Sequence, residues 1–153
     1  MKIKIIEAIE FLVHHIIFWR EIFRDVKWYE SHYQVSNLWN VKTKQREVRV
    51  WKNFRTVKSI ILKSVYIRKY ENVFLSNGSS KRYKVHRLVA QAFLWLDIND
   101  PDVVVRHKDD KTYNNYSRNL KLWTQIQNMQ DKIWKKYQKK KVSTKKKKWI
   151  TRS

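Results

Sequence analysis

The sequence predicts an α+β fold with four parts in order along the chain. These are an N-terminal amphipathic helix (1–26), a small β-rich motif (27–85), a strand–strand–helix module (86–137) and a basic C-terminal tail (138–153). Three observations predict this order. Apolar residues recur at helical spacing near the N-terminus, short alternating segments bounded by turn residues follow, and a strand, a polar loop, a second strand and a helix come last.

The first element is a helix over residues 3–24. Its apolar residues recur three and four positions apart, with most acidic residues off that stripe. Such a stripe packs on the protein's own core or on a partner. It consists of Ile5, Ile9, Leu12, Ile16, Trp19 and Phe23.

Strands and turns dominate the next segment. The single glycine, Gly78, lies in the turn 76–79, where a hairpin needs a residue with positive φ. The strands on either side of this turn are expected to pair. Alternation and β-branched residues predict strands at 33–35, 48–51, 60–67, 72–75 and 81–85.

The C-terminal third begins with a short helix over 86–96. A strand at 103–105 then leads into Arg106 and His107, and a polar loop separates it from a second strand at 120–123. Thr124, with Gln127 three residues later, predicts an N-cap and a helix to about residue 137.

Charge composition indicates the class of partner. The 153 residues include 35 Lys and Arg against 13 Asp and Glu, a formal net charge of +22. A compact fold with this charge repels itself unless a polyanion neutralises it. Aromatic residues are interleaved with the basic ones, which favours nucleic acid, because bases stack on rings. No cysteine is present for disulfides or thiolate metal sites. The most apolar stretch, 11–19, is too short to span a bilayer, so no membrane partner is predicted.

Basic residues are concentrated toward the C-terminus, where 132–153 holds 11 of them and no acid. Such a run is a solvated tail in isolation and an ordered arm on nucleic acid. We expect its cations to bind phosphates without regard to sequence. The predicted nucleic-acid-binding residues are Arg106, Lys108, Lys111, Arg118, Lys121, Lys135, Lys136, Lys139, Lys140, Lys141, Lys145, Lys146, Lys147, Lys148 and Trp149.

The module carries a candidate catalytic group. His107, at the end of a strand, could activate a water, while a neighbouring residue and one from the following helix hold a divalent ion against a phosphate. Asn119, at the start of the second strand, could cross the hairpin and orient the histidine. This order of elements is typical of ββα-metal nucleases.

Three blocks of sequence resemble the HNH homing endonucleases of phage and organellar introns. VVRHKDDKTYNNYSRNLKLWTQIQN (104–128) is similar to their D/N-H-x-D-G, N-N, N-L-x-W/V-x-T and N pattern. VHRLVAQAF precedes it, and WYESHYQVSNLWNVK (28–42) resembles their DNA-contacting G-Y-E-x-x-Y-x-V-S-N-x-G-x-V motif. The resemblance implies a ββα-metal (HNH) module with His107 as general base, Asn119 as its partner and Asn128 as a metal ligand. It also implies that Asn115 and Asp109 shape the loop and that His86 is structural.

The chain departs from the family pattern at four positions. Arg106 stands where the family has an Asp or Asn that binds the metal, and a guanidinium cannot ligate a cation. Trp28, Trp39 and Asp110 replace glycines, so the tight turns there are expected to be rebuilt or relaxed. These differences predict a retained binding surface with a lost or weak metal site.

Gene composition adds a clue to the source. One Gly, one Pro and three Ala indicate an AT-rich gene, and eight Trp fit a genetic code in which UGA also encodes Trp, as in mitochondria. We therefore expect a mitochondrial, organelle-encoded protein without a cofactor. Its partner is nucleic acid, rRNA favoured over DNA, among neighbouring proteins of a mitochondrial ribosome. The alternative is an active Mg²⁺-dependent HNH homing endonuclease that cuts DNA. A DNA-binding regulator is a third reading, which no helix-turn-helix or zinc motif supports.

Overall fold

The computed structural model describes the backbone of residues 20–150 and the side chains of residues 20–141. Most of the helix predicted over 3–24 lies outside this range. At its C-terminal end the prediction is wrong, because Phe23–Asp25 forms strand β1. This strand pairs with β2 (Tyr33–Ser36), which in turn pairs with β3 (Val41–Thr43).

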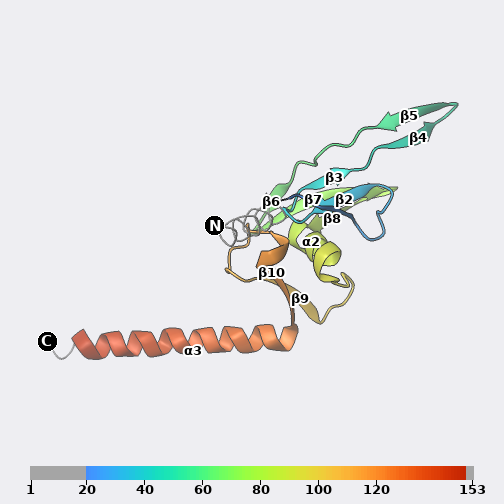
Figure 1. The fold of residues 1–153 in the computed structure, drawn as a ribbon. Helices are drawn as coiled ribbons and strands as arrows, with labels where there is room; N and C mark the ends of the chain where they lie inside the picture. The colour runs from blue at the N-terminus through green and yellow to red at the C-terminus, as the bar shows by residue number, and fades with distance from the viewer. Residues whose placement is uncertain (1–19, 151–153) are drawn as a thin grey trace, which may run out of the picture.

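Two further antiparallel units follow. Strands β4 (Arg46–Val50) and β5 (Asn53–Val57) form a hairpin that stands away from the rest of the chain (Figure 1). Strands β6 (Val65–Ile67), β7 (Tyr70–Asn77) and β8 (Ser79–Lys84) form a three-stranded sheet. The hairpin predicted around Gly78 is confirmed, with a φ of 82° at that glycine. The strand predicted over 60–67 is shorter, since residues 60–64 contribute only a bridge between Ile61 and Lys42.

The module has the predicted order. Helix α2 (Val85–Leu94) comes first, then β9 (Val103–His107), a 3-10 turn at Ser117–Asn119, β10 (Leu120–Thr124) and helix α3 (Gln125–Ile150). The mixed α+β fold agrees with the predicted class. The core forms where α2 packs against β2, β7 and β10, and it includes Val35, Leu75, Val89 and Leu120.

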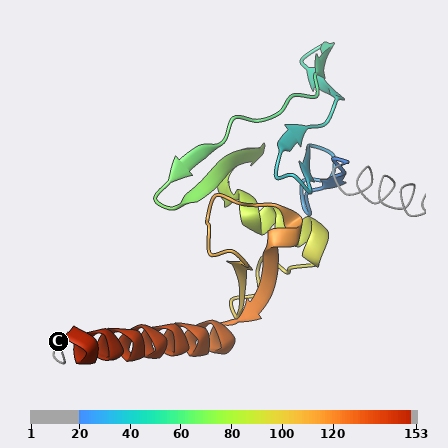
Figure 2. The ribbon, with the colours of Figure 1, turned by 60° about the vertical axis from the view of Figure 1, so that its left-hand side comes forward.

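Helix α3 begins as predicted and ends much later. Thr124 and Gln127 form a reciprocal capping box, with bonds of 3.0 Å from the Thr124 N–H to Oε1 and 3.1 Å from the Gln127 N–H to Oγ1. The helix continues to Ile150, so the boundary predicted at residue 137 is wrong: the basic run extends the helix, in keeping with the good helix propensity of Lys. In Figures 1 and 2 most of its length projects from the module as a separate rod.

Left-handed backbone occurs at residues other than glycine. In residues 20–150, φ lies between 58° and 67° at Trp28, Trp39, Trp51, Arg68, Trp95 and Asp110. The turns at the three positions where the family has glycine are therefore retained, not rebuilt as expected. Local hydrogen bonds hold them, such as the 2.8 Å bond from the Trp28 N–H to Glu30 and the 3.0 Å bond from the Trp39 N–H to the Ser36 carbonyl. An L-residue in this region costs about 1–2 kcal/mol.

No helix in the described part of the chain is long and apolar enough to cross a membrane.

Candidate active site

A cleft of about 320 Å³ lies between the N-terminal end of α2, the end of β9 and the first turns of α3. It brings together three of the residues that the sequence singled out, Arg106, His107 and Asn128. Asn119, the fourth, does not line it. Lys84 and Arg87 from the α2 end and Lys132 from α3 also border the cleft, so its rim is cationic.

His107 is buried, and its ring is held through one nitrogen. Nε2 lies 3.0 Å from Oδ1 of Asn115, and Nδ2 of the same amide donates to the Glu71 carboxylate at 2.8 Å. A carboxylate only accepts hydrogen bonds, so the Asn115 amide must turn its NH₂ toward Glu71 and its oxygen toward His107. Nε2 of the neutral ring therefore carries the proton, and Nδ1 keeps the lone pair that a general base needs.

Glu71 is a member of this chain of bonds that the sequence did not indicate. It lies on β7, is 8% exposed, and also accepts a 2.5 Å hydrogen bond from the Ser64 hydroxyl. It is 44 residues from Asn115 in sequence. No local motif identifies a contact over that distance in sequence. The one signal for a role of Glu71 was an acidic residue within a strand of a strongly basic chain.

Asn119 does not orient His107 as expected. Its Nδ2 donates to Oδ1 of Asp109 at 2.9 Å and to the Asn114 carbonyl at 2.8 Å, which closes the loop between the two strands. The Asn115 side chain, fully buried, points inward from that loop and makes the bond to the histidine. The roles expected for Asn119 and Asn115 are thus exchanged. Asp109 does shape the loop as predicted, and although its desolvation raises the pKa, the bonds from Asn119, Lys111 and Asn114 lower it to about 2.

His86 packs edge-on against His107, with ring centroids 5.3 Å apart. Desolvation by burial lowers the pKa of His86 to about 3, helped by the neighbouring charges of His107, Lys84 and Arg87. The ring is therefore neutral at physiological pH. This fits the structural role that the resemblance implied for it.

Arg106 is held by two carboxylates beside the cleft. Its guanidinium lies 3.1 Å from Asp110 and 2.5 Å from Asp131 of α3, and Lys135 contacts both acids. Desolvation lowers the pKa of Arg106, but the hydrogen bonds that its guanidinium donates to Asp110 and Asp131 outweigh it and raise the pKa above its usual value. We call these four residues the Arg106 cluster.

The donor set at this cleft does not fit the divalent ion that the resemblance implies. The cation of Arg106 occupies the place of a ligand, and its nearest carboxylates are already paired with Arg106 and Lys135. Asn128 remains as a neutral oxygen donor that lines the cleft. Over the described side chains, no group of three or more His, Cys, Asp or Glu could hold a metal ion.

The predicted nucleic-acid-binding residues fall on two surfaces. Lys108, Lys111 and Arg118 are exposed on the β9–β10 loop, and Lys121 lies opposite Arg106 on β10, 4.1 Å from the Trp123 ring centre. Lys135 is paired within the Arg106 cluster. Four more of the predicted residues are exposed on α3, namely Lys136, Lys139, Lys140 and Lys141. The remaining predicted residues, Lys145 to Lys148 and Trp149, lie outside the described side chains.

Comparison with known proteins finds a similar curated protein and a similar solved structure. The DNA endonuclease I-HmuI of Bacillus phage SP01 is 37% identical over 110 residues, which cover 72% of this chain and 56% of that protein. A structure described as DNA binding and cleavage by the HNH homing endonuclease I-HmuI superposes with a TM-score of 0.58 at 29% identity, covering 80% of this chain and 66% of that one. The chain thus spans little more than half of its curated relative. No family model matches.

Proposed function

Because the chain belongs to the HNH homing endonuclease family, we propose that it binds DNA and cleaves a strand at the cleft around His107. The observation that carries this proposal is the buried series Glu71–Asn115–His107, which fixes the ring and leaves Nδ1 as the basic nitrogen. A surface histidine needs no such support, whereas a general base does.

The chain's own residues supply part of the chemistry of hydrolysis. Nδ1 of His107 accepts a proton from a water whose oxygen attacks the phosphorus, and the bond from phosphorus to the leaving sugar oxygen breaks. Solvent returns a proton to that oxygen. Lys84, Arg87 and Lys132 on the rim attract the phosphate and offset its charge. No step is assigned to a metal ion, because the donors present do not fit one.

DNA is the proposed partner in place of the rRNA favoured by composition. The support comes from I-HmuI, a DNA endonuclease whose solved structure concerns DNA binding and cleavage. The rRNA preference, the mitochondrial location and the place in a ribosome stay predictions.

A second function, DNA binding without cleavage, is favoured by the Arg106 cluster. Its guanidinium stands where the family has a metal ligand, and its two acids hold it there. A nuclease scaffold can keep its binding surface after such a change.

Nicking of supercoiled plasmid separates the two functions. The full chain is incubated with Mg²⁺, with Mn²⁺ or with a chelator, alongside His107→Ala. We expect wild type to nick and His107→Ala to be slower by about 10²–10⁴.

The outcomes differ for the two functions. Nicking that survives His107→Ala would mean contamination or another site, and the cleavage proposal would fall. If wild type is inert but Arg106→Asp nicks with Mg²⁺, the chain is a binder that lost its metal ligand. Gel-shift titration of the same preparations checks DNA binding, on which both functions depend.

A further inference from the structure

Tryptophan is concentrated at backbone positions that normally require glycine. Of the eight Trp, six have described side chains, and four of those six adopt left-handed backbone: Trp28, Trp39, Trp51 and Trp95. Only a few per cent of non-glycine residues have positive φ, and a bulky side chain there is an outlier. Four such residues of one type in one small protein are not a chance result.

Each of the four sites has an independent reason to hold glycine. Positions 28 and 39 match the two glycines of the family's DNA-contacting motif. Trp51 is the first residue of the two-residue loop between β4 and β5, a site that favours glycine in hairpins. Trp95 caps α2 in the left-handed conformation with its N–H bonded to the Ala90 carbonyl, as helix-terminating glycines do.

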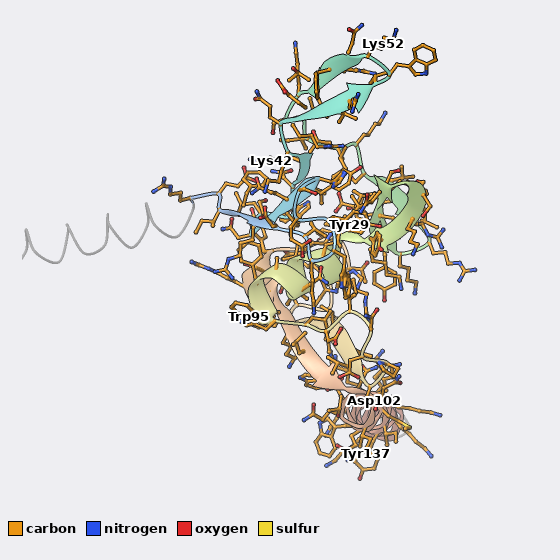
Figure 3. All side chains as sticks on the ribbon, turned by 90° about the vertical axis from the view of Figure 1, so that its right-hand side faces the viewer. Tyr29, Lys42, Lys52, Trp95, Asp102 and Tyr137 are labelled. Atoms are coloured by element: carbon orange, nitrogen blue, oxygen red, sulfur yellow. The ribbon has the colours of Figure 1, made fainter. Side chains whose placement is uncertain are left out.

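The tryptophan side chains gain little in return. Trp51 is 89% exposed and Trp95 is 83% exposed, so neither buries its ring. Trp39 packs against Tyr116, with ring centroids 4.4 Å apart. Trp28 lies near the cation of Lys27 at 5.1 Å, and Trp95, labelled in Figure 3, near that of Arg24 at 6.0 Å. Trp123 and Trp134 behave differently, because they lie in regular strand and helix.

We propose that positions 28, 39, 51 and 95 are encoded by UGA, and that the source organism translates UGA as glycine. The natural protein then carries glycine at all four. UGA differs from the glycine codon GGA by a single base, and the chain otherwise holds one glycine. The same composition that suggested UGA as a tryptophan codon is thus explained by a different assignment, which also accounts for the backbone.

The codons and the stability of a corrected chain test this proposal. UGG at any of these four positions would overturn it there. The quadruple variant Trp→Gly at 28, 39, 51 and 95, made from a standard-code gene, is expected to melt roughly 5–10 °C higher, since strain is relieved at each site. Trp134→Gly, in regular helix, is the matched control and is expected to melt lower. A quadruple variant that melts at a lower temperature than the chain with the four tryptophans would contradict the assignment. Neither readout needs a nicking assay.

Discussion

Replacing Asn115 with alanine breaks both bonds that support His107. Nε2 of His107 and the carboxylate of Glu71 would then each lose a partner, at 3.0 and 2.8 Å respectively, in a site where both residues are buried. A buried polar group without its partner costs about 1–3 kcal/mol, and more if it is charged. We therefore expect Asn115→Ala to lower the free energy of unfolding by about 4 kcal/mol.

Urea unfolding followed by tryptophan fluorescence measures that loss. With a slope near 2 kcal/mol per molar, the midpoint should fall by about 2 M. Asn114→Ala is the matched control, because its amide bonds to the exposed Asp109 at 2.7 Å, and we expect a loss under about 1 kcal/mol. ¹⁵N spectra of the His107 ring should show a single tautomer in wild type and a mixture in Asn115→Ala. Equal midpoints for the two variants would refute the reasoning.

Three further expectations follow from the structure. The pKa of His86 falls to about 3 in the folded state, so between that pH and about 6.5 the unfolded chain binds one proton more than the folded chain. The contribution of His86 to stability is therefore complete above about pH 6.5 and is lost as the pH falls toward 3, by about 4–5 kcal/mol in total. Urea midpoints measured across this pH range should lose that component in His86→Leu. Thr124→Ala removes the α3 cap and should cost about 1 kcal/mol in the same assay. Asp131→Asn weakens the hold on the partly buried Arg106, and amide exchange in the first turns of α3 should quicken about five-fold, equivalent to roughly 1 kcal/mol.

Local signals in the sequence were sufficient for elements that are stabilised locally. Gly78 marks its hairpin because the turn needs positive φ, and Thr124 with Gln127 marks the start of α3 because both bonds join residues three apart. His107 could be identified because a strand leads directly into it and a second strand and helix follow.

The rest depended on contacts that spacing along the chain does not encode. The fold of the β9–β10 loop decides whether Asn115 or Asn119 faces His107. The Asn115 amide points inward because it donates to Glu71 on β7, whereas Asn119 bonds within the loop. Residues 60–64 were predicted as part of a strand, yet their pairing with β3 amounts to one bridge, Ile61 with Lys42, flanked by hydrogen bonds of Ile60 and Leu62. The end of α3 was missed because a run of lysines is compatible with both a solvated tail and a helix.

Helix α3 has 26 residues and is attached to the module near its N-terminal end. At 1.5 Å per residue it is about 39 Å long, while its ion pairs to the module are at Asp131 and Lys135, near the base. In Figure 2 the remaining length runs clear of the other elements. A tilt of roughly 10° at the base moves the free end by about 7 Å. Arg106, which stands where the family has a metal ligand, therefore also helps to fix the direction of α3 through its ion pair with Asp131. A small shift of Arg106 at the cleft would move the C-terminal end of this cationic helix by a larger distance.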